Sequence, residues 1–573
     1  MATVTYRIRT CVTATFLLSL LTAVVHPLPV TAAAPQSGSA YRVTVDRTGM
    51  YRLTYSDLVN AGVPVADLAP QHLHLTSGYP AVEVASEITG ASDGRFDPTD
   101  EIRFYGQARD SKYGAMNTYW LAYDNTDGVR MAVRNGTPAN GTTPSAFQTT
   151  AMFEQDLLYR SSLPFLDQAD HWFWDGWAVE AGHSQTISFT LSVTNPVAAA
   201  ASLLVAYQGE FFSYIVSPDH HVQVVLNGHL LGEATWDEAL PFNKTFNFDG
   251  GWLLRGDNTV AITAFGDTGL AVESGYVDFM TLTYQRTFAS AGAGLQFDAD
   301  GPGAWHLQAT GFGSSQVVVY DVTNAGTPQA ISQVRVQPAG STFTLDFSDV
   351  VTAETHYVAV GDNGWLTPRA IQADTPSDLH NSANGADYIV ISYPDFLSAV
   401  QPLADYRAST GLRVKVVNVQ DVYDEFGSGL LSAEALHDFL QFTYSQWTPP
   451  APRYVLLVGD GTYDFKDVAG RGNQTFIPPY LALVDALNGE TAADNDYVNF
   501  DSDPLPEMAI GRFPVKTAAQ TSTIVNKVLA YEATPVTSDW MRKATLVADK
   551  YDPLAGNFAA LSDEGLAYFP PEY

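Results

Sequence analysis

The densest group of carboxylates in the sequence lies in one short segment, from Asp494 to Asp503. Its aspartates repel one another unless water or a cation separates them, and hard cations such as Ca²⁺ prefer oxygen ligands. The spacing is Asp-x-Asp twice, without a full EF-hand loop, so a solvated acidic loop is the alternative. A further carboxylate, Asp460, is flanked by Gly459 and Gly461, which permit a sharp turn and leave it accessible. The residues that we predict as Ca²⁺ ligands are Asp460, Asp494, Asp496, Asp501 and Asp503.

Nucleophilic chemistry has few candidates in this chain. The only cysteine is Cys11, inside an apolar N-terminal run, and no histidine follows His437, which we interpret as a surface or interface residue. Three serines near the predicted helices have helix-start or helix-end explanations: Ser392, Ser409 and Ser432. None of them lies in a Gly-x-Ser-x-Gly elbow, and the Gly-Asp-Gly turn lacks the third glycine of a dinucleotide-binding loop. We therefore predict no catalytic residue and no bound nucleotide in this sequence.

The carboxylates depend for their position on a region, from about residue 387 onward, in which strands alternate with helices. The predicted strands are residues 387–392, 412–417, 454–458, 508–511 and 543–548. Helices are predicted from Pro394 to about Ser409, from the cap residue Ser432 onward, and after a capping box formed by Thr517 and Gln520. This alternation predicts a mostly parallel sheet wrapped on both faces. Ligands gather at the carboxyl ends of such strands, and the Gly-Asp-Gly turn follows the third one.

The preceding residues indicate β-rich modules. A chain of 573 residues is too long for one core, and its 46% hydrophobic and 16% charged residues exclude a disordered chain. Residues 221–226 alternate and end at Asn227-Gly228, a strong hairpin signal. We predict an N-terminal β-rich domain over 35–165, a jelly-roll β-sandwich over 166–290, a small β module or connector over 291–375, and an α/β domain over 385–573.

The N-terminus has the layout of a bacterial-type secretory signal peptide over residues 1–34. Arg7 and Arg9 precede an apolar run, and small residues up to Ala34 follow it. We expect a secreted, extracellular or cell-surface protein that meets the membrane only during export, with an uncleaved N-terminal anchor as the alternative. Because Cys11 lies within the predicted signal, the processed chain would have no disulfide bond.

Charge and aromatic content limit the choice of partners. The formal net charge of -33 disfavours nucleic acids and anionic membrane surfaces. Tryptophans in and near the predicted sandwich could stack on a carbohydrate, although core packing is the other interpretation. These residues are Trp172, Trp174, Trp177 and Trp236.

The order and spacing of several short motifs closely resemble the gingipain family of cysteine peptidases, family C25. These motifs are Asp387–Ile391, Tyr406–Leu412, Tyr454–Asp460, Asp494–Tyr497 and Ala509–Pro514. The resemblance covers about residues 385–573 and implies a caspase-like, Rossmann-like fold of two α/β subdomains with the catalytic pair in the second. It also implies that Asp460 and the Asp494/Asp496 loop match positions that bind calcium in family members.

By the same resemblance, the chain is a secreted cysteine-type endopeptidase that acts on protein or peptide substrates. The family's chemistry needs a cysteine thiolate and a histidine from a His-Gly element, both beyond the strand predicted at 543–548. This sequence contains neither, so we expect a truncated α/β domain and no thiol peptidase activity from the chain by itself. Two alternatives are a non-catalytic adhesion protein with a carbohydrate- or peptide-binding sandwich, and a surface transpeptidase similar to the sortase-like gingipain relatives of the type IX secretion system.

Overall fold

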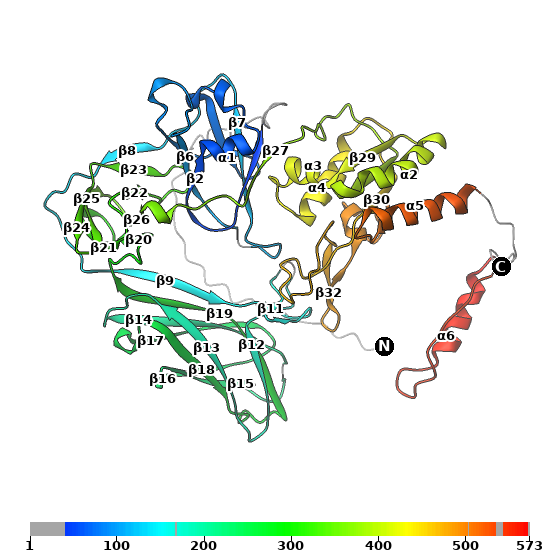
Figure 1. Cartoon of the computed structure of the whole chain (residues 1–573). Helices are drawn as coiled ribbons and strands as arrows, with labels where there is room; N and C mark the ends of the chain where they lie inside the picture. The colour runs from blue at the N-terminus through cyan, green and yellow to red at the C-terminus, as the bar shows by residue number, and fades with distance from the viewer. Residues whose placement is uncertain are drawn as a thin grey trace, which may run out of the picture.

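The computed structural model describes residues 40–109, 111–166, 169–211, 213–501, 503–533 and 543–570, except for the side chain of Asp67. The predicted signal peptide and Cys11 lie outside these residues. The described chain forms three β modules followed by an α/β domain (Figure 1), which confirms the predicted fold class. No described helix is both long and apolar enough to cross a lipid bilayer.

Two sheets form the N-terminal module, with the strand orders β27-β1-β7-β3-β4 and β2-β6-β5. Its strands are β1 (Tyr41–Val45), β2 (Gly49–Thr54), β3 (Leu73–Ser77), β4 (Val82–Glu83), β5 (Glu87–Thr89), β6 (Glu101–Gly106), β7 (Asn117–Tyr123) and β27 (Ala370–Ala373). Helix α1 (Tyr55–Asn60) begins at a capping box formed by Thr54 and Asp57. Along β1, Tyr41, Val43 and Val45 point into the core because successive side chains of a strand alternate between its faces.

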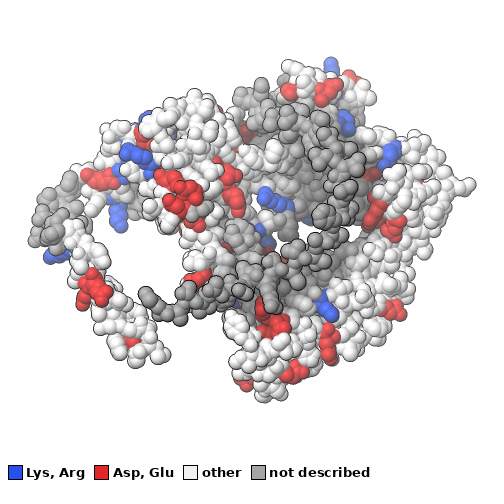
Figure 2. Space-filling model, turned by 180° about the vertical axis from the view of Figure 1, so that it is seen from behind, with Lys and Arg blue, Asp and Glu red and all other residues white. Residues whose placement is uncertain are grey.

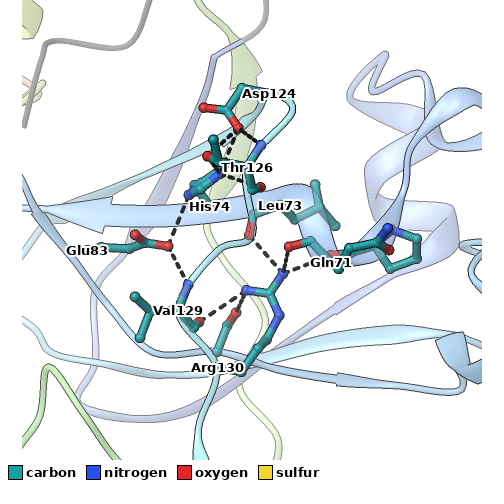
Figure 3. A network of polar contacts seen from close by, with 10 residues as sticks. Gln71, Leu73, His74, Glu83, Asp124, Thr126, Val129 and Arg130 are labelled. Atoms are coloured by element: carbon teal, nitrogen blue, oxygen red, sulfur yellow. Dashed lines mark hydrogen bonds and ion pairs between the residues drawn. The ribbon is translucent and has the colours of Figure 1, made fainter.

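A polar network around Arg130 closes one side of this module (Figure 3). The Arg130 guanidinium donates to three backbone carbonyl oxygens at 2.8–2.9 Å, those of Pro70, Gln71 and Leu73. Beside it, the Glu83 carboxylate accepts from the Val129 backbone N–H at 2.6 Å and lies 3.1 Å from His74 Nδ1. These contacts fix the loops that flank β3 without help from regular strand pairing.

A β-sandwich of two antiparallel sheets follows. One sheet has the order β12-β19-β14-β17, with β9 also paired to β19, and the other has the order β13-β18-β15-β16. The strands are β9 (Ala146–Glu154), β12 (Asp175–Glu180), β13 (Gln185–Val193), β14 (Ala200–Gly209), β15 (His220–Leu226), β16 (His229–Trp236), β17 (Pro241–Asp249), β18 (Gly256–Ala264) and β19 (Val272–Thr287). Asn227 (φ 50) and Gly228 (φ 85) join β15 to β16 as predicted, because a tight hairpin needs positive φ at both central residues.

A third β module packs between the N-terminal module and the sandwich, with the strand orders β20-β26-β22-β23-β8 and β21-β25-β24. Its strands are β8 (Ala132–Asn135), β20 (Gly294–Ala299), β21 (Gly303–Phe312), β22 (Val318–Asp321), β23 (Gln329–Ser332), β24 (Arg335–Ala339), β25 (Thr342–Val351) and β26 (Thr355–Val360). Strand pairing crosses the boundaries drawn from the sequence: β9 joins the sandwich, β8 joins the third module, and β27 returns to β1.

The α/β domain is built on a parallel sheet with the order β29-β28-β30-β33. Its strands are β28 (Tyr388–Ser392), β29 (Val414–Asn418), β30 (Tyr454–Val458) and β33 (Ala509–Phe513), and its helices are α2 (Leu397–Ser409), α3 (Val419–Phe426), α4 (Ala433–Gln446) and α5 (Ala518–Ala533). Ile389 and Ile391 pack beneath α3 and α4, whereas Val390 between them packs toward α2 and α5. The sheet is therefore covered on both faces, as the alternation of strands and helices predicted.

The prediction of a fifth strand at residues 543–548 is wrong. These residues form no strand and are exposed, and the chain continues to a short helix α6 (Phe558–Gly565) that stands away from the body in Figure 1. An apolar run becomes a parallel strand only where a neighbouring strand and a covering layer bury it, and the described chain brings neither to this segment. The sequence also gave no sign of the hairpin formed by β31 (Leu481–Asp485) and β32 (Gly489–Ala492).

Contacts between modules hold the α/β domain against the β-rich part of the chain. The Tyr159 and Tyr463 rings stack with centroids 4.4 Å apart, and Lys466 Nζ lies 3.0 Å from Asp156 Oδ2. The backbone N–H of Glu490 in β32 donates to the Ser161 carbonyl at 2.6 Å. Figure 2 shows carboxylates spread over several modules on one face, in keeping with the net charge of -33.

Candidate functional site at the carboxyl edge of the sheet

The turn after β30 runs flush against a neighbouring segment and needs both of its glycines. A Cβ atom added to Gly459 would lie 2.9 Å from Phe476 Cβ, and one added to Gly461 would lie 2.5 Å from the Ile477 carbonyl oxygen. Between them, the Asp460 carbonyl accepts the backbone N–H groups of Phe476 and Ile477 at 2.9 and 3.2 Å. The Gly-Asp-Gly motif thus joins β30 to residues 476–477 at the edge where ligands of parallel sheets gather.

Arg512, in β33, is the centre of this edge. Its Nη1 donates to the carbonyl oxygens of Gly459 and Ile477 at 2.9 and 2.8 Å, and its Nη2 donates to the Pro478 carbonyl at 2.9 Å. Its Nε and Nη2 also bind the two carboxylate oxygens of Asp494 at 2.7 and 2.9 Å. A bidentate guanidinium–carboxylate pair is the strong form of this interaction. Burial lowers the pKa of Arg512, but the hydrogen bonds and charge of Asp494 outweigh it, and the pKa is raised overall.

The structure assigns separate local contacts to the other predicted ligands. The Asp460 carboxylate lies 3.4 Å from Lys516 Nζ. The backbone N–H of Asp496 donates to the Ala493 carbonyl, within a short 3₁₀ turn. Asp501 and Asp503 each accept a backbone N–H two residues further along their own exposed loop. The carboxylates of Asp494, Asp501 and Asp503 therefore lie in one stretch of sequence but have different partners.

These residues do not fit one calcium ion. Ca²⁺ needs six to eight oxygen ligands around a single point. Among the described residues, no three of the five aspartates bring their carboxylate oxygens within 4.8 Å of one another, and the two groups that do so lie elsewhere, at Asp298 with Glu354 and His356 and at Glu154 with Asp156 and Asp170. At Asp494, the Arg512 guanidinium already occupies the position that the prediction gave to a cation, and it binds the carbonyls as well.

The residues considered for nucleophilic chemistry have structural roles. Ser392 is fully buried, and Ser432 caps α4 by accepting the backbone N–H of Ala435 at 3.1 Å. His437 lies on α4, where its ring packs against Phe500 with centroids 5.6 Å apart. Among the described residues, the polar neighbour of the His437 ring is the adjacent Asp438, whose carboxylate lies 3.4 Å from Nδ1.

The tryptophans considered for sugar stacking are mostly in the core of the sandwich. Trp174, Trp177 and Trp236 are 4–7% exposed and belong to one cluster of buried side chains between the two sheets. Trp172 is half-buried and stacks near Tyr463 of the α/β domain, with centroids 6.4 Å apart. Core and interface packing therefore account for all of them.

The sequence did not predict a cleft at the carboxyl ends of β28 and β29. This cleft has a volume of about 490 Å³, and its walls come from two modules. β1 and β27 form one side, and α3 with residues 474–476 forms the other. No single stretch of sequence contains its polar residues, which is why local patterns could not reveal it.

Comparison with known proteins places the α/β domain in a family. Residues 381–573 match the family model of peptidase family C25, and no curated protein matches the chain. This match confirms the resemblance recognised from the motifs: residues 381–573, about the last third of the chain, are similar to peptidase family C25.

Solved structures give the fold of the whole. The chain is similar to dimeric latent PorU from Porphyromonas gingivalis, with 20% identity and a TM-score of 0.59 over 90% of this chain and 51% of that one. The chain thus spans about half the length of that relative. A carbohydrate-binding module, CBM36 in complex with calcium and xylotriose, matches 18% of this chain and 77% of its own at 19% identity, with a TM-score of only 0.14, which is too low to support an argument.

Proposed function

We propose that this chain supplies the β modules and the first α/β part of an exported cysteine-type endopeptidase. The observation that carries the proposal is the match of residues 381–573 to peptidase family C25. The substrate would be a protein or peptide. The β modules would support this domain, since the stacking of the Tyr159 ring on Tyr463 and the ion pair of Asp156 with Lys466 tie them to it.

The proposed chemistry divides between this chain and residues outside it. A cysteine peptidase needs a thiolate nucleophile and a base that activates it. The sequence has one cysteine, Cys11, and its last histidine is His437, which has a packing role on α4. We infer that the described residues position the sheet and its Arg512-centred edge, while the nucleophile and its base come from elsewhere in the active protein.

A peptidase assay tests whether this chain lacks the nucleophile. We expect the 573-residue chain to show no alkylator-sensitive hydrolysis of fluorogenic peptides or denatured casein. Alkylator-sensitive turnover by this chain would contradict the proposal.

The genomic DNA after codon 573 provides the matching test of the family chemistry. We expect it to encode a His-Gly element and then a cysteine after an apolar strand, and an unrelated frame would refute the peptidase assignment.

Export is a second part of the proposal, supported by the basic and apolar segments before residue 34. Expression of the full chain in a bacterium, followed by mass spectrometry of the N-terminus, tests it. We expect a mature N-terminus close to Ala33 or Ala34 and recovery outside the cytoplasm. Recovery of the intact Met1 form in the cytoplasm alone would contradict export.

A further inference from the structure

An aromatic pocket lies where the N-terminal module meets α4 of the α/β domain. Its volume is about 650 Å³, within the range of pockets that bind small organic molecules. The phenyl and phenol rings that line this aromatic pocket are those of Tyr79, Phe426, Phe442, Tyr444 and Phe500. Two of these side chains are exposed, Tyr79 at 57% and Tyr444 at 39%. Exposed aromatic surface gathered around a recess indicates an interaction site.

One wall of the pocket is a stack of rings that is held in place from behind. The His380 ring lies flat on Phe426, with centroids 4.0 Å apart and 10° between the ring planes, and Phe442 meets His380 edge-on at 5.2 Å. Glu425 fixes the orientation of His380, because its Oε2 accepts the His380 backbone N–H at 2.9 Å and lies 3.0 Å from Nδ1. Burial raises the pKa of Glu425, but its hydrogen bonds with His380 and Ser377 outweigh burial and lower the pKa overall. This wall is therefore ordered and has an ionised carboxylate behind it.

The other walls come from separate segments of the chain. Tyr444 of α4 packs on Phe500, with centroids 5.5 Å apart. The backbone N–H of Phe500 donates to Glu507 Oε2 at 2.7 Å, which fixes this loop. Tyr79 approaches from the N-terminal module, and its hydroxyl lies 3.5 Å from His380 Nε2. Rings from both modules thus surround one space.

The charge of the pocket favours a cation. Asp438 of α4 lies in the lining, and none of the described lining residues is a lysine or an arginine. Burial raises the pKa of Tyr79, and the negative charges of Asp438 and Glu425 raise it further, so both carboxylates act on this ring. The imidazole of His380 is already paired with Glu425.

The lining also decides which kind of cation fits. A metal ion needs several ligand atoms around one point, and Asp438 belongs to none of the described groups whose ligand atoms lie within 4.8 Å of one another. A primary ammonium has three N–H donors that need acceptors. The neighbouring hydroxyl of Ser445 instead donates along α4 to the Gln441 carbonyl at 2.8 Å. A quaternary ammonium has no N–H donor to satisfy, and aromatic rings attract its charge.

We propose that the aromatic pocket binds a trimethylammonium group such as that of choline. Tyr79, Tyr444 and Phe500 surround the methyl groups, and the Asp438 carboxylate is the counter-ion. The residues that line this pocket are separate from those of the Arg512-centred edge. The site goes beyond the proposed peptidase function, because binding here needs no nucleophile and can be measured on the chain as it exists.

An NMR titration of the full chain at pH 8 and low salt tests the proposal through the trimethyl signal of choline. The matched control is the neutral carbon isostere of choline, in which a carbon atom replaces the charged nitrogen and the shape is unchanged. We expect saturable binding of choline and binding of the isostere about tenfold weaker, because the isostere keeps the apolar contact and loses the charge. Equal binding of the two compounds, or no saturable binding of choline, would overturn the proposal.

Variants locate the site. Tyr444→Ala should weaken choline binding by about fivefold because it removes one ring, whereas Tyr444→Phe keeps the ring and should stay within about twofold of the wild type. Asp438→Asn should weaken binding by about threefold, since the carboxylate is partly exposed to solvent.

The matched controls lie on the other face of the sheet, which α2 and α5 cover. Tyr531→Ala on α5 and Asp405→Asn on α2 make the same changes at exposed positions and should leave the affinity within about twofold. Thermal melting of each variant confirms folding. Unchanged affinity in both Tyr444→Ala and Asp438→Asn, or an equal loss in Tyr444→Phe and Tyr444→Ala, would refute the site.

A trimethylammonium group occurs in soluble compounds and in lipid headgroups, and vesicles distinguish the two sources. We expect the chain to bind choline without sedimenting with phosphatidylcholine vesicles, which would assign a soluble ligand. Sedimentation that excess choline prevents would assign the same pocket to the lipid headgroup. Sedimentation that excess choline and Tyr444→Ala both leave unchanged would place the choline group outside this pocket and contradict the proposal.

Discussion

Two partly buried arginines tie loops to strands in different modules, and they differ in one respect. Arg130 in the N-terminal module binds the carbonyls of Pro70, Gln71 and Leu73, and no described carboxylate forms an ion pair with it. Arg512 in the α/β domain binds carbonyls too, but it also holds both oxygens of Asp494. Burial lowers the pKa of Arg130, whereas Asp494 raises that of Arg512 despite its burial.

The difference shows what each arginine does for its module. Arg130 is a set of hydrogen-bond donors for loop carbonyls, and the charges of Glu83 and Asp127 act on it without forming an ion pair among the described residues. Arg512 is both a set of donors and the counter-ion of a loop aspartate, at the edge of the sheet where a calcium ion was predicted. A third arginine, Arg42, extends the series, because it faces more carboxylates than it can neutralise.

The largest effect is expected at Arg512. Arg512→Met should lower the free energy of unfolding of the α/β domain by about 3 kcal/mol, because it removes one partner of a largely buried ion pair and the donors of three carbonyls. Hydrogen exchange of β30 and β33 measures the loss within this domain. Arg512→Lys keeps the positive charge but loses the bidentate guanidinium geometry, and it should lower the free energy of unfolding by less. Protection in Arg512→Met equal to that of the wild type would contradict the role assigned here.

Arg130→Met should have a smaller effect, about 2 kcal/mol, confined to the N-terminal module. The variant leaves three loop carbonyls without their donor, but it leaves no carboxylate without an ion-pair partner. The loop carbonyls can form hydrogen bonds with water instead. Limited proteolysis at residues 70–73 and 124–130 measures the local opening. A loss as large as that of Arg512→Met would show that the carboxylate is not what distinguishes the two sites.

The smallest effect is expected at Asp421, in the cleft where carboxylates outnumber the single guanidinium, that of Arg42. The raised pKa of Asp421, about 7, means that the folded chain binds more protons than the unfolded chain between about pH 4 and pH 7. This contribution to stability is lost as the pH rises through that window. Asp421→Asn should therefore melt at a higher temperature than the wild type at pH 8 and at the same temperature at pH 4.5. The reverse order at pH 8 would show that Asp421 has an attractive partner in the folded chain.

Local patterns predicted much of the α/β domain and little of its site. β28, β30 and α4 follow from apolar runs and a cap residue that act over a few neighbours. Asp494 was recognised as important but was given a metal as its partner. Its actual partner, Arg512, lies 18 residues further on and on another element, so spacing alone could not show the pair.

The failures have the same physical origin. Residues 543–548 have the composition of a buried strand, but pairing depends on what lies beside them. The cleft depends on Asp374 and Asp421, which come from different modules and meet only in the folded chain. Patterns of period two or 3.6 describe which face of an element is buried, not what that face meets.

The Arg512 guanidinium acts as the cation at the carboxyl edge of the α/β sheet. A crystal structure of the full chain grown with excess calcium chloride tests it most directly. We expect Arg512 to bind both oxygens of Asp494 and the Gly459 carbonyl with no metal between them. A calcium ion bound by Asp494 and these carbonyls, with the arginine displaced, would contradict it.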